Sequence, residues 1–369
     1  MKVLHVISDK NIGGAGILLL NLLSEMRGGE FENVVALPKN GALTERLSEM
    51  GVPHVGLLHP CDRISAGAVR EICDIIKREN VSLVHANAAL SARVAGRRCG
   101  IGVVHTRHCC FPPTGIWRAS VVRRLGGVWN RMLSDRVIAT ADAAAENLHA
   151  LGIPQKKISV IINGSKPIRA VSEEELETVR CSFSIQPNDF CIGICARLES
   201  YKGQDVFLHA AKRLTERAPQ IPFCFLIVGT GTRRDALEQL ANQLAISDVV
   251  RFTGFVADMA PIYRLLRINV NCSSGTETSC LAVSEGMSAG VPCAVSDYGG
   301  NRAMIGDSEA GCLFPVGDAE ALAECMLRIA TDHATEERMR IAARERYETH
   351  YTAQRMANEV QALYRELLK

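Results

Sequence analysis

The stretch Ser273–Pro292 has the sequence S-S-G-T-E-T-S-C-L-A-V-S-E-G-M-S-A-G-V-P, and the pattern of the whole chain follows from it. The preceding segment Ile268–Cys272 is short, apolar and β-prone, so we expect a buried strand there. Thr278 or Ser279 can cap the helix that follows, and Gly290 with Pro292 can end it. The stretch therefore predicts a strand, a tight loop and a short helix. The N-terminus of that helix, with its free amides, lies above the edge of a sheet, where it can bind an anion.

Two carboxylates belong to this stretch: Glu277 lies just before the expected helix and Glu285 about two turns inside it. Either acid could be a solvated surface residue. The residues around Glu285 are small and apolar, however, so the helix is expected to be largely buried, and a buried acid needs a partner such as the hydroxyl groups of a ligand. Gly286 costs a helix up to about 1 kcal/mol relative to Ala, which indicates that another group approaches closely.

The length of 369 residues predicts two domains, and the hydrophobic content of 47% is ample for two cores. No apolar run reaches the roughly 18 to 20 residues of a membrane span. The first ten residues are typical of a buried strand rather than a signal peptide. The 14 cysteines are scattered, without C-x-x-C pairs or zinc-type spacing, and indicate thiols in a reducing cytoplasm.

Strand and helix signals alternate from the start to about residue 162 and again from residue 190, which predicts two parallel sheets with helices on both faces. Turn residues at 163–167 mark the linker. We therefore expect one domain at 1–166, a second at 167–350, and a final amphipathic helix within 351–369 that packs on one of them. Ligands of such sheets bind beyond the carboxyl ends of the strands.

The glycine-rich loop after the first strand ends in N-I-G-G-A-G, where Gly13 and Gly14 precede a helix. The loop is typical of a phosphate-binding turn. It does not complete G-x-G-x-x-G, and no acid ends the second strand, which argues against an NAD-dependent dehydrogenase.

His105 and His108 are three residues apart on the fifth strand of the first half, so they point to opposite faces. We expect His108, at the strand end, to face the substrate. A His-Cys metal site is the alternative, but the sequence has no matching second cluster, and we predict no metal. The tract Arg93–Arg136 contains nine arginines, one acid, Trp117 and Trp129. It is either a solvated basic face or a surface for anionic lipid or an anionic acceptor.

Arg197 and Lys202 lie five residues apart where a strand of the second half leads into a helix. Such a pair can bracket a diphosphate, with Arg as a planar fork and Lys as a point charge. Acids for hydroxyl groups and cations for phosphates together describe a nucleotide-sugar site.

These motifs resemble the retaining glycosyltransferases of family 4, which have the GT-B fold. The resemblance rests on Arg197-x4-Lys202-Gly203, on Glu277-x7-Glu285 followed by G-x-x-x-G-V-P, and on the early Gly-Gly-Ala loop. It covers essentially the whole chain. It implies two Rossmann-like domains facing across a cleft, an acceptor-binding first domain, a nucleotide-sugar-binding second domain and a C-terminal helix that crosses back to the first. It also implies neither a metal nor another cofactor.

The resemblance assigns roles to particular residues. Arg197 and Lys202 match the pair that holds the donor diphosphate and stabilises the leaving group. Glu277 matches the acid near the donor sugar, Glu285 the acid that binds the ribose hydroxyls, and His108 a histidine near the sugar. Further donor-binding positions are Gly13, Gly14, Gly254, Phe255, Val256, Ser279, Cys280 and Leu281, with Gly254–Val256 matching the segment whose backbone contacts the base.

One departure concerns the residues after Glu277, where Thr278-Ser279-Cys280 stands in place of the Phe-Gly that is frequent in the family. The donor sugar is therefore open. We expect a retaining hexosyltransferase that moves a sugar from a UDP- or GDP-sugar to an acceptor hydroxyl on a glycan or lipid-linked acceptor. Such an enzyme would serve cell-surface polysaccharide or glycolipid synthesis in the cytoplasm or at the periphery of the cytoplasmic membrane, without a nucleic-acid partner. A nucleotide-sugar epimerase of the same architecture and a non-catalytic nucleotide-sugar-binding protein are the alternatives.

Overall fold

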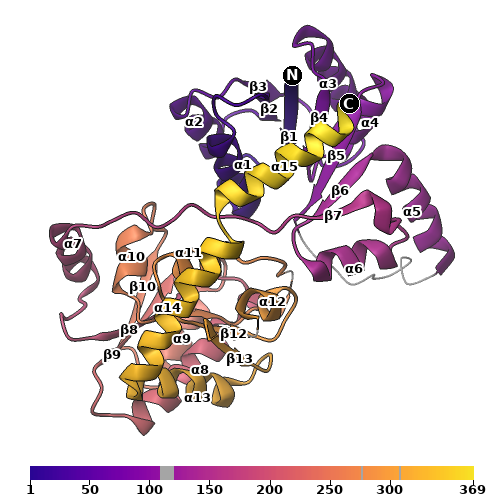
Figure 1. Ribbon diagram of the computed structural model, residues 1–369. Coiled ribbons are helices and arrows are strands. Elements are labelled where there is room, and N and C mark those ends of the chain that lie inside the picture. The colour runs from indigo at the N-terminus through magenta and orange to yellow at the C-terminus, as the bar shows by residue number, and fades with distance from the viewer. Residues whose placement is uncertain (109–119, 276, 307–308) are drawn as a thin grey trace. The chain divides into compact units, whose positions relative to one another are not determined.

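The computed structural model describes residues 1–108, 120–275, 277–306 and 309–369. Contacts divide the chain into two compact units (Figure 1). Unit 1 comprises Met1–Ser165 together with Ala353–Lys369, and unit 2 comprises Lys166–Thr352. The predicted boundaries at 166 and 350 lie within two residues of this division, and the final helix belongs to unit 1.

Unit 1 is built on a seven-stranded parallel sheet in the order β3-β2-β1-β4-β5-β6-β7. Its strands are β1 (Lys2–Ile7), β2 (Glu32–Pro38), β3 (His54–Leu57), β4 (Leu83–Asn87), β5 (Gly102–Arg107), β6 (Arg136–Ala139) and β7 (Ile158–Val160). Its helices are α1 (Gly14–Glu25), α2 (Ala42–Glu49), α3 (Ala66–Arg78), α4 (Leu90–Arg98), α5 (Ser120–Leu133), α6 (Asp142–Ala150) and α15 (Ala353–Leu367), with a 3₁₀ turn η2 (Gln155–Lys157).

The central strand β1 is covered on both faces, which explains why its sequence is apolar almost throughout. The final helix α15 packs beside α1, as Figure 1 shows in yellow and indigo. Its apolar side contributes Met356, Val360 and Tyr364 to the interior of unit 1, where Tyr364 is fully buried. The hydroxyl of Tyr364 lies 2.5 Å from Nδ1 of His85, so the helix is also held by a polar contact.

Unit 2 is built on a six-stranded parallel sheet in the order β10-β9-β8-β11-β12-β13. Its strands are β8 (Phe190–Cys195), β9 (Phe223–Val228), β10 (Val250–Gly254), β11 (Ile268–Asn271), β12 (Cys293–Ser296) and β13 (Gly311–Phe314). Its helices are α7 (Glu173–Phe183), α8 (Gln204–Arg217), α9 (Arg234–Gln243), α10 (Ala260–Leu265), α11 (Leu281–Ser288), α12 (Asn301–Ile305), α13 (Ala319–Thr331) and α14 (His333–His350), with a 3₁₀ turn η3 (Ser200–Lys202).

Helix α11 begins later than the sequence predicts. Its N-cap is Cys280, in an extended conformation, and not Thr278 or Ser279. Both of those side chains are buried in the loop that folds around Glu277, so the backbone becomes helical only at Leu281.

The close approach indicated by Gly286 is confirmed, and the neighbour is part of the protein. A Cβ atom on Gly286 would lie 2.4 Å from Nδ2 of Asn269, so the glycine lets α11 lie directly against β11.

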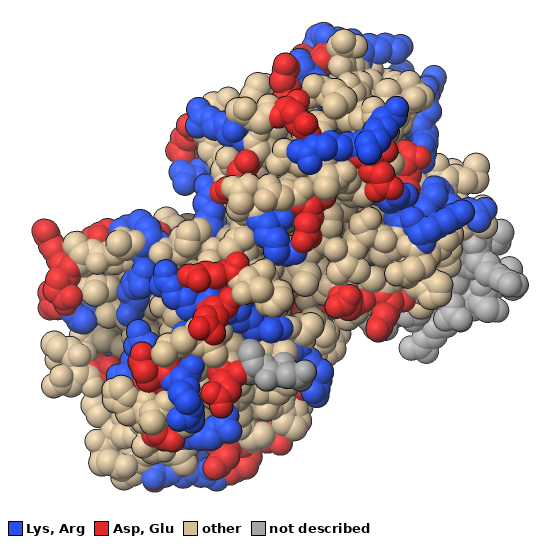
Figure 2. Space-filling view, viewed as in Figure 1, with Lys and Arg blue, Asp and Glu red and all other residues tan. Residues whose placement is uncertain are grey.

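Acidic and basic side chains alternate over both units on the face that Figure 2 shows. The twelve described cysteines are free thiols. Within the described ranges, no helix is both long and apolar enough to span a membrane.

Candidate active site

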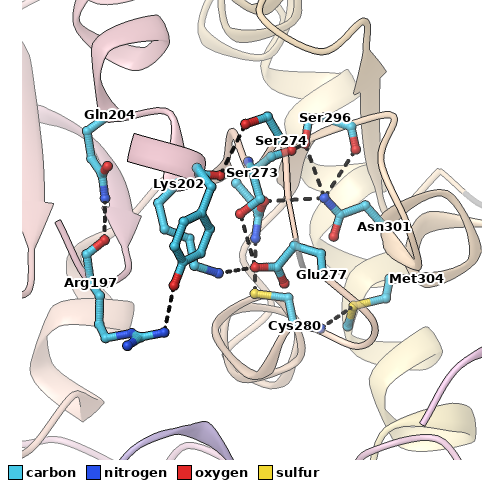
Figure 3. A network of polar contacts seen from close by, with 12 residues as sticks. Arg197, Lys202, Gln204, Ser273, Ser274, Glu277, Cys280, Ser296, Asn301 and Met304 are labelled. Carbon is cyan, nitrogen blue, oxygen red and sulfur yellow. Dashed lines mark hydrogen bonds and ion pairs between the residues drawn. The ribbon is translucent and has the colours of Figure 1, made fainter. Parts of the chain in front are cut away.

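The carboxyl edge of the unit 2 sheet gathers most of the residues singled out in the sequence. Arg197 follows β8, Glu277 follows β11, and Gly254 ends β10. Because all strands are parallel, these three loops leave the sheet on the same edge. Figure 3 shows the network of polar contacts around Arg197, Lys202 and Glu277.

Lys202 and Glu277 form an ion pair at the centre of this network. Both side chains are largely buried, with 16% and 7% of their surface exposed. The hydroxyl of Ser273 donates a second hydrogen bond to Glu277 Oε1 at 3.0 Å. Burial opposes the charge of Lys202, but the adjacent carboxylate outweighs it, and the pKa of Lys202 is raised. Lys202 is therefore a fixed cation, and Glu277 is held by two donors.

Arg197 is exposed and is oriented by Tyr201, whose hydroxyl accepts a hydrogen bond from Arg197 Nη2 at 2.6 Å. The ring of Tyr201 also lies 5.5 Å from Lys202 Nζ, so one tyrosine contacts both cations. The fully buried Gln204 donates from Nε2 to the carbonyl oxygen of Arg197 at 2.9 Å. Gly203 between them has a φ of 70°, and a Cβ there would lie 2.4 Å from the carbonyl oxygen of Cys272. This glycine brings the cationic turn against the end of β11.

A buried amide network supports the loop of Glu277. Asn301 donates from Nδ2 to Asn271 Oδ1 at 3.3 Å and to the carbonyl oxygen of Ser296 at 3.1 Å. The hydroxyl of Ser296 donates to the carbonyl oxygen of Ser273 at 2.6 Å, and Ser273 N donates to Asn271 Oδ1 at 3.0 Å. Figure 3 shows this chain leading from Asn301 to Glu277.

Sequence reasoning missed these supporting residues, although a signal was present. The strand I-N-V-N places Asn269 and Asn271 in a buried β11, and a buried amide requires partners. Because these two buried amides need hydrogen-bond partners, the sequence indicates a cluster of polar residues at the end of β11.

Glu285 has a different partner, because its Oε2 accepts a hydrogen bond from the hydroxyl of Tyr263 at 2.9 Å. Burial raises the pKa of Glu285 to about 7, and the hydrogen bond from Tyr263 only partly counteracts this. The carboxyl group is thus close to half-protonated at neutral pH, and a ligand that donates hydroxyl groups would favour its charged form.

The N-terminus of α11 lies beside the network. Cys280 accepts at Sγ from Asn271 Nδ2 at 3.0 Å, and burial raises its pKa to about 12, so it remains a thiol. No side-chain hydrogen bond from the described N-cap residue satisfies the first amides of the helix. Ser279 and Leu281 flank Cys280 at this end. The amides there provide partial positive charge toward an anionic ligand.

The segment Gly254–Val256 leaves the edge strand β10. Gly254 has a φ of 72°, and the side chain of Phe255 is 72% exposed. The contact between the backbone of this segment and the base, which the resemblance implies, stays a prediction.

Gly13, Gly14 and His108 belong to unit 1. Gly13 caps α1, and a Cβ on Gly14 would meet no atom within 4 Å. His108 lines a cavity of unit 1 and shares a hydrogen bond of 3.0 Å between its Nε2 and Asn87 Oδ1. Burial lowers the pKa of His108 to about 4, so the imidazole is neutral. His105 and His108 are both half-buried, and of the two only His108 is among the residues that line this cavity.

The structure describes the tract Arg93–Arg136 only in part, because the side chains of residues 109–126 lie outside the described ones; Arg98 and Arg131 are exposed. Arg93 is 5% exposed and donates to Ser134 and Asn130, while Arg97 pairs with Asp135. Arginines that face the interior satisfy backbone and side-chain acceptors there. Trp117 lies outside the described residues. On α5, Val128, Trp129 and Met132 are 44%, 50% and 63% exposed.

Within the described part of the chain, no three His, Cys, Asp or Glu side chains are placed to hold a metal ion.

Two family models match this chain. Residues 12–167 match the model described as Glycosyltransferase Family 4, and residues 189–332 match the model described as Glycosyl transferases group 1. Together they cover well over half of the sequence. The chain belongs to the family 4-like glycosyltransferases. The first match covers β2 to β7 and the early glycine loop, and the second covers β8 to β13 and the E-x7-E element.

Curated relatives of this family 4-like chain have glycosyltransferase names. A D-inositol 3-phosphate glycosyltransferase of Rhodococcus erythropolis is 29% identical over 249 residues, which are 63% of this chain and 56% of the relative. The match thus spans little more than half the length of that relative. A UDP-Gal:alpha-D-GlcNAc-diphosphoundecaprenol alpha-1,3-galactosyltransferase of Escherichia coli is 24% identical over 346 residues, 90% of this chain and 88% of the relative.

Among solved structures, Anabaena HepE in complex with UDP has a TM-score of 0.86 and 20% identity, and the comparison covers 100% of both chains. This likeness and the two parallel sheets establish the GT-B fold that the sequence predicts.

Proposed function

We propose that this protein is a retaining glycosyltransferase that moves a hexosyl group from a nucleoside-diphosphate sugar to an acceptor hydroxyl. The observation that carries the proposal is the buried Lys202–Glu277 pair beside Arg197, at the edge where β8 and β11 end. An acid that is held by two donors can orient the hydroxyl groups of a sugar. Lys202, which pairs with this acid, and the neighbouring Arg197 can hold the diphosphate to which that sugar is attached.

The chemistry of the departing diphosphate explains the cations. As the glycosidic bond breaks, negative charge develops on the leaving phosphate. Arg197 and Lys202 are positioned before the reaction, Arg197 by Tyr201 and Lys202 by Glu277. Such preorganised charges contribute several kcal/mol to catalysis, and removing a single donor of this kind costs about 10² to 10³ in rate. The proposal therefore assigns leaving-group stabilisation to these side chains, without a metal or other cofactor.

Glu285 binds the ribose hydroxyls in this proposal, the α11 amides face the diphosphate, and Gly254–Val256 contact the base. The UDP bound to the Anabaena structure supports a UDP-sugar donor, with GDP-sugars as the second possibility. The lipid-linked acceptor in the name of the E. coli relative supports a glycan or lipid-linked acceptor in polysaccharide or glycolipid synthesis. We place the protein in the cytoplasm, at the periphery of the membrane.

The donor is tested first by thermal unfolding with UDP, GDP and ADP. A ligand that binds only the folded state stabilises it by about 2.7 kcal/mol at 100 times its Kd. UDP or GDP should raise the Tm and ADP should not.

Activity is tested by incubating the matching nucleotide sugars with acceptor glycans and lipid-linked sugars in EDTA, and by assigning the anomer of the product by NMR. Release of nucleoside diphosphate with retention of configuration is expected. An epimerised donor formed without acceptor would show an isomerase, and tight donor binding without turnover would show a binding protein. An inverted product or a loss of activity in EDTA would contradict the corresponding part of the proposal.

A further inference from the structure

A cavity lies at the amino edge of the unit 2 sheet, opposite the carboxyl edge that carries the candidate active site. It lies where α10 leads into β11 and α11 leads into β12, at the amino ends of these strands. The cavity measures about 370 Å³ with the solvent at its mouth. Three arginines are among its lining residues, Arg264, Arg267 and Arg340, and its apolar lining includes Leu266 and Val291. The donor-site residues Arg197, Lys202 and Glu277 lie on the other edge.

The arginines around this cavity retain hydrogen-bonding capacity. Arg267 donates from Nε and Nη2 to both carboxylate oxygens of the buried Glu336 and stacks 4.7 Å from the ring of Phe190, which fixes its planar fork. Arg264 makes only long contacts from Nη2, at 3.3 Å and 3.4 Å, to two backbone carbonyl oxygens.

Arg340 is the least engaged of the three. Its contact among the described residues is a 3.8 Å ion pair between Nε and Glu337. Three guanidinium charges therefore face two carboxylates, and the terminal nitrogens of Arg340 are left for a ligand.

We propose that this cavity is a binding site for a phosphate monoester, separate from the donor site. A guanidinium group can donate two parallel hydrogen bonds to two oxygens of one phosphoryl group. The contact is therefore both charged and directional. Arg264 and Arg340 supply the guanidinium groups that hold the phosphoryl oxygens, Arg267 stays paired with Glu336 and forms part of the wall, and Leu266 and Val291 contact the carbon skeleton of the ester. The ligand class comprises small phosphorylated metabolites and the headgroups of phospholipids.

The test measures binding of sn-glycerol 3-phosphate by calorimetry. The Arg264→Ala/Arg340→Ala double variant removes the two exposed guanidiniums and leaves the Arg267–Glu336 pair in place, so the fold is kept. Loss of charge-assisted contacts should raise Kd at least about tenfold. Two controls should leave Kd unchanged. Arg344→Ala changes an arginine one turn further along α14 that pairs with Glu348, and Arg197→Ala changes the donor site.

A Kd that is the same in the double variant as in the wild type overturns the proposal, as does an absence of binding to the wild type at millimolar ligand. A loss of binding in Arg197→Ala alone would place the ligand in the donor site and also overturn it. The Arg340→Lys variant keeps the charge without the fork and should bind weakly. Co-sedimentation with vesicles that contain phosphatidic acid distinguishes a phospholipid headgroup from a soluble phosphorylated metabolite as the ligand. Vesicle binding that depends on Arg264 and Arg340 identifies a headgroup, and binding of the soluble ester alone identifies a metabolite.

Discussion

The hydroxyl of Tyr263 donates a 2.9 Å hydrogen bond to the carboxyl group of Glu285, which lies within α11. Burial nevertheless raises the pKa of Glu285 to about 7. The folded protein therefore keeps a proton between about pH 4.5 and pH 7 that the unfolded chain has lost. Stability contributed by this group is complete below pH 4.5 and is lost as the pH rises through 7.

Glu285→Gln should consequently become more stable than the wild type as the pH rises. The Gln side chain cannot ionise, so the variant escapes a cost of about 1.4 kcal/mol for each unit of pKa shift. We expect a gain of about 1 to 3 kcal/mol at pH 8 and none at pH 4.5, measured by urea unfolding. Glu238→Gln, which alters an exposed pair on α9, is the control. A difference between Glu285→Gln and wild type that is constant across this range would contradict the raised pKa.

The two glutamates of the E-x7-E element should fail in different ways. Glu285 is assigned to the ribose, so its contacts are equal in the ground and transition states, and Glu285→Gln should raise KM more than it lowers kcat. Glu277 is assigned to the transferring sugar, where a small misplacement costs about 10² in rate, so Glu277→Gln should lower kcat at near-normal nucleotide affinity. Steady-state kinetics with calorimetry of UDP binding measures both. The reverse pattern would exchange the two roles, and full activity of both variants would place the site elsewhere.

Lys202 and Arg197 should differ in their effect on folding although both are assigned to the diphosphate. Lys202→Ala leaves the buried Glu277 without its cation, and breaking such a pair costs about 3 to 5 kcal/mol. Arg197 is exposed, so Arg197→Ala should change stability by less than about 0.5 kcal/mol. Both variants should lose turnover. Adding Glu277→Gln to Lys202→Ala should restore part of the stability and none of the activity. Equal unfolding free energies for the two single variants would show that the ion pair is not buried in solution.

The sequence predicts the fold well because strands in doubly covered parallel sheets are apolar throughout and turn residues separate them. The strand expected at Ile268–Cys272 is β11 (Ile268–Asn271), and the helix after it ends at Ser288, just before Gly290 and Pro292. The start of α11 is wrong by one or two residues, because Thr278 and Ser279 are buried in the loop of Glu277 and local propensity does not contain the tertiary packing that buries them.

The site is predicted less completely than the fold. The motifs identify Arg197 and Glu277, because charged side chains directly after an apolar strand stand out in the sequence. The residues that hold them, Tyr201, Ser273 and Asn301, come from three separate segments. Only the tertiary structure brings these segments together. The sequence indicates that Arg93 is part of a basic surface, but its side chain is buried. A run of arginines in the sequence does not reveal which of them are directed inward.

Helix α5 is the part of unit 1 that we expect to contact an anionic membrane. Its exposed Val128, Trp129 and Met132 lie beside Arg131, and such a mixture of apolar and basic side chains is typical of a helix at a membrane surface. Trp129→Ser with Met132→Ser should reduce co-sedimentation with phosphatidylglycerol vesicles several-fold, and high salt should weaken the wild type. Leu58→Ser, which alters another exposed apolar residue of unit 1, is the control. Binding that is indifferent to lipid charge and to the double variant would make α5 an ordinary solvated helix.

Asn301 should act on catalysis through Glu277, because its hydrogen bonds reach Glu277 only by way of Asn271, Ser296 and Ser273. Asn301→Ala removes the donor to two buried acceptors and should cost about 1 to 3 kcal/mol of stability. A shifted Glu277 should then lower kcat about tenfold or more while UDP affinity stays near normal. Ser274→Ala, at an exposed position of the same loop, should change neither quantity.

A double-mutant cycle decides whether Asn301 works through that carboxylate or only supports the fold. If it positions Glu277, then Asn301→Ala should lower kcat in the wild type and have little further effect in the Glu277→Gln variant, because the interaction it supports is already lost. Stability should fall by the same amount in both backgrounds, since the amide network itself is unchanged. Equal losses of kcat in the two backgrounds would mean that Asn301 acts independently of Glu277, and the network would then be a feature of folding alone.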